Sequence, residues 1–122
     1  MIAGHRGDRR RAREGLGDGD PSVRAAALGA LGRLADLGAG DLLAGLADPS
    51  AAVRRRAAQE AAAIDEGADH RPLDDALVRT TSDPDPLVVD AACWALGERQ
   101  VASAVGALAA ATTHPDIRCR ET

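Results

Sequence analysis

The sequence of 122 residues contains no phenylalanine, no tyrosine and no lysine, and Trp94 is its only aromatic residue. Most globular cores draw on large aromatic and branched side chains, so this chain must bury alanine, leucine and valine instead. Alanine is the best helix former and is small enough to let helices approach closely. The composition therefore predicts an all-α protein in which helices stack through small side chains.

The chain also lacks a basic net charge, because 19 acidic residues outweigh 15 arginines to give a formal charge of -4. Nucleic acid is therefore not an expected partner. Cys93 and Cys119 lack Cys-x-x-Cys spacing, and the sequence shows no secretory signal. We therefore expect both cysteines to be reduced thiols. No apolar run approaches the ~18 residues of a membrane span. These absences predict a soluble cytoplasmic protein with no membrane segment.

A repeated segment is the main positive feature of the sequence. Residues Asp20–Gly32 recur most clearly as Asp85–Gly97, more loosely from Asp48, and in outline from His114. The aliphatic anchors of the four copies stand at positions 23, 53, 88 and 117, so the steps are 30, 35 and 29 residues. A period of this length is typical of stacked repeats. It favours an extended binding surface over a catalytic pocket.

Each copy predicts a helix that starts at Asp-Pro or His-Pro, because Asp is a good N-cap and Pro fits the first helical position. The apolar residues that follow recur at helical spacing, with one buried face. We expect longer helices at roughly 21–36, 49–64 and 84–98, with two extra residues after Pro49 in the second copy. We expect shorter helices at about 41–47, 72–80 and 101–111.

The two ends predict incomplete repeats. Residues 6–16 are expected to form the second helix of a repeat whose first helix is absent, and residues 117–122 the opening turns of another. Repeat arrays expose apolar faces at their ends and usually need polar caps. We therefore expect one repeat domain over residues 1–122, with about three helix pairs. It would be a piece of a longer array or would self-associate end to end.

The residues that carry the repeat resemble the HEAT repeat family, in the short bacterial form called PBS-lyase HEAT-like. That form follows the pattern Asp-Pro-x-Val-Arg-x-x-Ala-x-x-Ala-Leu-Gly, which residues 20–32 and 85–97 fit well and residues 48–61 fit less well. Val89 departs from the pattern by replacing the usual arginine. The resemblance implies an α-α superhelix, a HEAT-like solenoid of antiparallel helix pairs. It also implies that most relatives are scaffolds, while a minority are bilin lyases, deoxyhypusine hydroxylases or DNA glycosylases.

A catalytic or metal site is not evident in the sequence. A di-iron site on this scaffold would need His-Glu pairs on successive helices, yet none of His5, His70 and His114 is followed by Glu. Cys93 aligns with Leu28 beside the buried stripe, where a cysteine behaves as a small hydrophobe. We therefore expect no enzyme activity and no cofactor or metal.

Two groups of arginines invite a functional interpretation. The cluster of Arg9, Arg10, Arg11 and Arg13 is a candidate anion contact, but a solvated helix face is favoured, since no aromatic stacking partners lie nearby. Arg24, Arg54 and Arg118 share one motif position. We expect these three to pair with carboxylates or helix C-terminal carbonyls of the neighbouring unit and so to fix the repeat spacing.

Trp94 aligns with Gly29 and Gln59, off the main stripe. It is expected either to pack on the adjacent repeat, which is favoured, or to anchor a partner. Asp74, Asp75 and Arg79 are expected to lie away from the buried stripe of the second short helix. With Asp41 they would form an acidic strip for a partner, or simply a solvated face.

The sequence therefore predicts a non-catalytic module or scaffold that binds an unidentified protein through a curved helical surface. The alternatives are an enzyme of the bilin lyase-like or deoxyhypusine hydroxylase-like group, and a nucleic-acid-binding repeat that uses the arginine-rich N-terminus.

Overall fold

The computed structural model describes residues 2–64 and 71–99. Within them the chain forms helices and no strand. The six helices are α1 (Ile2–Gly15), α2 (Pro21–Arg33), α3 (Ala39–Leu46), α4 (Ala51–Ala61), α5 (Arg71–Thr80) and α6 (Pro86–Arg99). The predicted all-α class is confirmed, and the helices at 21–36, 41–47, 49–64, 72–80 and 84–98 are all present with shifted ends. The predicted helix at 101–111 and the opening turns at 117–122 lie outside the described residues.

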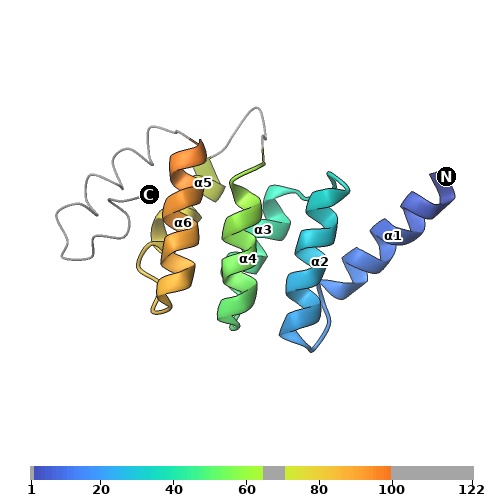
Figure 1. Cartoon of the computed structure of the whole chain (residues 1–122), viewed down its shortest axis with the longest axis horizontal. Helices are drawn as coiled ribbons and strands as arrows, with labels where there is room; N and C mark the ends of the chain where they lie inside the picture. Colours follow the sequence, from blue (N-terminus) through green and yellow to red (C-terminus); the bar gives the residue numbers. More distant parts are fainter. Residues whose placement is uncertain (1, 65–70, 100–122) are drawn as a thin grey trace.

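The helices form two layers (Figure 1). The longer helices α2, α4 and α6 stand side by side in one layer, where α4 packs against both of its neighbours. The shorter helices α3 and α5 pack against each other behind them. Helix α1 covers α2 at one end of the array. This arrangement is the helical superhelix expected from the repeat period.

Helices α1, α3 and α5 each pack closely against the helix that follows in the chain, so α1 pairs with α2, α3 with α4 and α5 with α6. Glycine makes the first two contacts possible. A Cβ atom added to Gly45 would stand only 2.8 Å from the Cβ of Ala57, and one added to Gly15 would stand 3.0 Å from the Cβ of Ala27. The two pairs are therefore built on the same glycine–alanine contact.

The starts of the longer helices correct one detail of the predicted repeat. Helix α2 begins at Pro21 after its N-cap Asp20, as expected, but α4 begins at Ala51 after Ser50. Pro49 is therefore not the first residue of α4, and the prediction of two extra residues in this copy is wrong. The equivalent of Asp48 is Asp18, because Val53 follows Asp48 by the same five residues that separate Val23 from Asp18.

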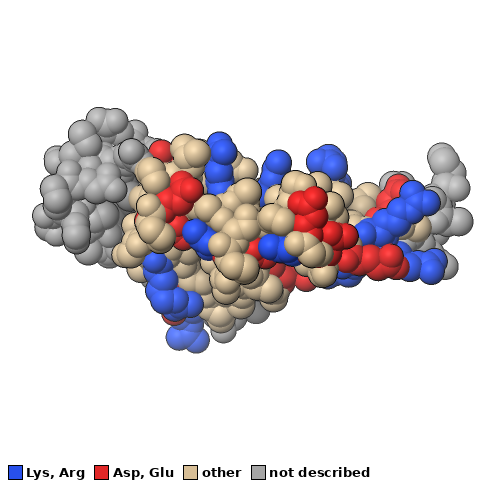
Figure 2. All heavy atoms as spheres, turned by 90° about the horizontal axis from the view of Figure 1, so that it is seen from below, with Lys and Arg blue, Asp and Glu red and all other residues tan. Residues whose placement is uncertain are grey.

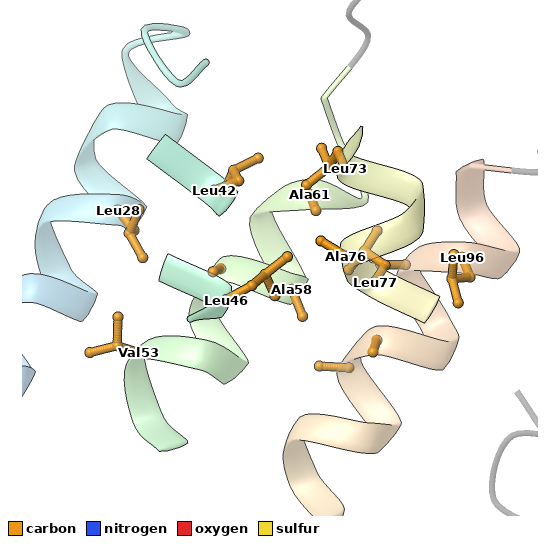
Figure 3. Close-up of a cluster of buried hydrophobic side chains, with 14 residues drawn as sticks. Leu28, Leu42, Leu46, Val53, Ala58, Ala61, Leu73, Ala76, Leu77 and Leu96 are labelled. Atoms are coloured by element: carbon orange, nitrogen blue, oxygen red, sulfur yellow. The ribbon is translucent and has the colours of Figure 1, made fainter. Parts of the chain in front are cut away.

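The core consists almost entirely of leucine, alanine and valine (Figure 3). The largest cluster runs through the stack from α2 to α6; its fully buried leucines are Leu28, Leu42, Leu73, Leu77 and Leu96. Cys93 is also buried, as expected, but it is disulfide-bonded. The expectation of a reduced thiol is therefore wrong at Cys93, while Cys119 lies outside the described residues.

Candidate functional site at the first helix pair

Arginines at the repeated motif position bind aspartates of the next unit, as predicted. The Nε and Nη2 atoms of Arg24 donate to the two carboxylate oxygens of Asp48, at 2.9 and 3.0 Å. Arg54 binds Asp83 in the same way, at 2.8 and 3.3 Å. We call these two pairs the arginine–aspartate ladder. Arg118, the third arginine of the motif, lies outside the described residues.

The ladder also fixes the loops that lead into the longer helices. The side chain of Asp48 accepts the backbone N–H of Ser50 at 2.8 Å, and that of Asp83 accepts the N–H of Asp85 at 2.9 Å. The Nη1 atom of Arg54 donates to the backbone carbonyl of Asp48 at 2.9 Å. Each ladder aspartate therefore organises its own loop while it binds the arginine of the longer helix in the preceding unit.

The same contacts shift the acidity of the ladder aspartates. The hydrogen bond from Arg24 holds the pKa of Asp48 below its ordinary value, against the opposing effect of burial. At Asp83, burial acts to raise the pKa, but hydrogen bonds from Arg54 and from the N–H of Asp85 bring the pKa below its ordinary value. Both carboxylates are therefore stabilised in the charged form that binds arginine. The sequence signal for these partners is an aspartate five residues before each valine anchor.

An open apolar groove lies between α1 and α2, with a volume of about 440 Å³. Small residues form much of its wall, and charged residues stand at its rim; the lining comprises Asp8, Arg11, Ala12, Gly15, Val23, Ala26, Ala27, Ala30, Arg33 and Leu34. Sequence reasoning did not find this groove. The repeat pattern predicts Val23 to be a buried anchor, yet it is 38% exposed.

The equivalent valines show why the groove is open. Val53 is 2% exposed and Val88 is fully buried. Helix α2 packs against α4, and α4 packs against α6, so each of these valines belongs to a helix that has a longer helix before it. Within residues 2–64 and 71–99, the only helix before α2 is α1, so the layer of α2, α4 and α6 has no member before α2. The exposure of Val23 is therefore a property of its place in the array.

The residues predicted to contact a partner do not form one strip. Asp41 is partly buried, where it accepts the N–H of Gly38 at 3.0 Å and an N–H of Arg13 at 2.9 Å. Asp75 and Arg79 are exposed on α5. Trp94 on α6 is 45% exposed. It lies on the same face of the helix as the exposed Leu87, seven residues earlier.

Asp74 is a correction to the predicted strip, because it is only 2% exposed. Its Oδ1 atom accepts a hydrogen bond of 2.6 Å from the Nε of Arg99. Arg99 also donates to the backbone carbonyls of Ala61 and Ile64, at 2.9 and 3.1 Å. This buried pair joins the end of α6 to α5 and to the end of α4. Sequence reasoning missed it because Asp74 stands next to the buried stripe and Arg99 lies outside the repeated motif.

The N-terminal arginine cluster is divided between two environments. Arg13 donates to Asp36 and Asp41, at 3.2 and 2.9 Å, and these contacts raise its pKa. Arg9 lies 3.9 Å from Asp36. Arg10 and Arg11 are exposed, and Arg11 stands at the rim of the groove. Asp36 in the loop between α2 and α3 and Asp41 in the first turn of α3 thus already bind part of the predicted anion contact.

Charge on the edge where the longer helices begin is mixed rather than separated. Figure 2 views this edge and shows acidic and basic side chains interspersed along it.

In the part of the chain that the structure describes, no three His, Cys, Asp or Glu side chains gather as metal ligands. His5 lies in α1, and its side chain is not described, while His70 and His114 fall outside the described residues.

These features define a helical solenoid in which each unit presents a face to the unit before it. The chain belongs to the HEAT repeat family: the family model for HEAT repeats matches residues 3–63 and 40–122. The match does not distinguish the short bacterial subtype, which stays a prediction. A search of curated proteins finds no match. None of the helices described is long and apolar enough to cross a membrane.

Proposed function

We propose that the chain is a non-catalytic protein-interaction module, and that the groove between α1 and α2 is its main binding surface. The observation that carries the proposal is the exposure of Val23, at 38%, beside a wall of alanine and glycine. Contiguous exposed apolar surface bordered by charged residues is typical of protein-binding sites. HEAT repeats generally serve as protein-interaction scaffolds, which supports the same function.

The chemistry of the groove favours a protein partner over a small molecule. Ala26 and Ala30 add little side-chain volume, so the backbone of a partner could approach α2 closely. Arg11 and Arg33 at the rim provide charged groups that surround such a contact, as the polar rim of a protein interface does. The groove is open to solvent along α1 and α2, which suits a helix or an extended segment.

A second surface supports the same function at the other end of the described array. Trp94 and Leu87 are large, exposed and on one face of α6. Tryptophan is among the residues most enriched at energetically important contacts. We propose Trp94 as a partner contact, with the exposed residues Asp75 and Arg79 of α5, and Asp41 as weaker candidates.

The test compares one substitution at two places. Ala26→Glu puts a carboxylate in the groove, whereas Ala52→Glu puts the same side chain on an exposed position of α4 outside it. A protein identified by affinity capture would be titrated against both variants by calorimetry. We expect Ala52→Glu to bind as the parent does and Ala26→Glu to lose binding. Equal binding by both variants would remove the groove from the proposal, and loss only with Trp94→Ala would move the site to α6.

A further inference from the structure

We infer that Arg33 and Arg56 together bind a phosphate group at the junction between α2 and α4, where Gly29 leaves room for both side chains. The ligand is a phosphate dianion, either free or carried as a monoester by another molecule. Of these three residues, only Arg33 also borders the groove between α1 and α2. The site therefore goes beyond the proposed function and can be tested separately from it.

The two guanidinium groups converge on one point of α2. A Cβ atom added to Gly29 would lie 3.6 Å from the Nη1 of Arg56 and 3.7 Å from the Nη1 of Arg33. Gly29 itself is buried, whereas both arginines are exposed to solvent. Because Gly29 has no side chain, Arg56 of α4 can lie across α2 and approach Arg33. An anion above Gly29 can therefore accept hydrogen bonds from both guanidinium groups at once.

The positive charge of this pair is largely uncompensated. Within residues 2–64 and 71–99, no carboxylate forms an ion pair with Arg33. Arg56 has one acidic neighbour, Glu60, whose carboxylate lies 3.7 Å from its Nη1 atom and is too distant for a hydrogen bond. Two like charges held close together repel each other unless an anion lies between them. A doubly charged phosphate balances both, and its oxygens match the forked donors of arginine.

The arginine pair is not part of the repeated motif. In the junction between α4 and α6, the spacing of the valine anchors places uncharged residues at the three equivalent positions, namely Gln59, Ala63 and Ala91. Arg33 and Arg56 also take no part in the arginine–aspartate ladder, which fixes one unit on the next. The stacking of the helices therefore does not explain why two arginines meet at this one junction, whereas a bound anion does.

The test follows the carbon NMR signals of the guanidinium Cζ atoms while inorganic phosphate is added to the full chain at roughly pH 8, where phosphate is a dianion. Ionic strength is held constant. The Arg33 and Arg56 signals should shift together and saturate with one dissociation constant. Arg33→Gln and Arg56→Gln should each weaken binding about fivefold or more, because each removes charge-assisted hydrogen bonds. Glu60→Gln should strengthen binding, because it removes the competing carboxylate.

The matched control is Arg55→Gln, which removes the same charge from the exposed neighbour of Arg56 on α4. It should leave the affinity for phosphate within about twofold of the parent, since exposed charges that make no direct contact contribute little. Equal weakening by Arg55→Gln and Arg56→Gln would overturn the inference, because it would show only a general attraction of the basic surface. Shifts that do not saturate, or acetate binding as tightly as phosphate, would overturn it as well.

A second titration identifies the source of the phosphate group. It uses a short uncharged peptide that carries one phosphoserine. Binding at least as tight as that of inorganic phosphate would assign the site to a phosphorylated side chain, and binding of inorganic phosphate alone would assign it to the free anion. Both results support the arginine pair as a phosphate site. Failure of every phosphate titration would leave the proposed function intact, because that function is tested by Ala26→Glu in the groove.

Discussion

The first helix pair and the second carry the same motif and differ in what covers them. Val23 is 38% exposed and Val53 is 2% exposed, although each stands five residues after an equivalent aspartate. The carboxylate of Asp48 binds Arg24, whereas Asp18 accepts a hydrogen bond from Arg24 only through its backbone carbonyl, at 2.8 Å. The comparison teaches that in this fold a motif residue is buried by the unit before it. The valine and the aspartate of the motif are therefore core and ladder residues in the second unit, whereas the equivalent valine of the first unit is exposed.

The ion pair of the third unit, between Asp74 and Arg99, is buried. We expect its loss to have the largest effect on stability. Replacing Arg99 by methionine leaves Asp74 buried without its partner, which typically costs about 3–5 kcal/mol of stability. Urea unfolding followed by circular dichroism measures the loss. The control is Arg9→Met in the first unit, where the ion pair is long and half exposed and a change below ~1 kcal/mol is expected. Equal losses would contradict the burial of the third-unit pair.

The two valines provide the direct comparison between the first and second units. Val53→Ala removes two buried methyl groups and should lower the free energy of unfolding by about 2 kcal/mol. Val23→Ala should cost less than ~1 kcal/mol, because its side chain is already partly in water. Chemical denaturation of both variants under one set of conditions gives the difference. A Val23 variant as unstable as the Val53 variant would mean that the groove is closed in solution.

The two glycines sharpen the comparison at the contact between paired helices. Gly45→Ala forces a methyl group against both Ala57 and Leu28, and overpacking of this kind costs about 1–2 kcal/mol. Gly15→Ala meets Ala27 but no leucine, and α1 can shift because it packs closely on α2 alone. We expect its effect to stay within ~0.5 kcal/mol, partly offset by the helix propensity of alanine. Thermal unfolding should place the Gly45 variant clearly below the Gly15 variant.

The smallest expected effect is the loss of stability when acid protonates the aspartates of the ladder pairs. Because Arg24 holds the pKa of Asp48 below its ordinary value, the contribution of this pair is complete above the ordinary pKa and is lost as the pH falls through the lower pKa of the folded state. We expect about 1 kcal/mol of stability to be lost as the pH is lowered from about 5 to below the folded-state pKa, with a shallower dependence in Arg24→Gln. Stability measured across this range in both proteins provides the check. Identical profiles would show that the pair does not contribute.

Local rules predicted the helices well, because alanine-rich stripes and Asp-Pro starts act within a few residues of the chain. They failed at Asp48, where the aspartate caps a turn and binds Arg24 instead of starting the helix at Pro49. The pairing of Arg24 and Arg54 with the next unit followed from their shared motif position. The burial of Asp74 could not be predicted in this way, because it depends on Arg99, which lies 25 residues later and outside the motif.

The groove itself could not be predicted from the motif, because a motif does not state whether a neighbour is present. Val23 and Val53 occupy the same position in the pattern, and only the packing of α2 on α4 separates them. Likewise, the division of the arginine cluster depends on Asp36 and Asp41, which contact Arg13 from the loop after α2 and from the first turn of α3.

The solvent accessibility of the valine methyl groups distinguishes an open first unit from a covered one. In the methyl spectrum of the full chain, a soluble paramagnetic agent should broaden the Val23 signals strongly and leave those of Val53 and Val88 sharp. Sharp Val23 signals in the free protein would contradict the account, because they would mean that the first unit is already covered.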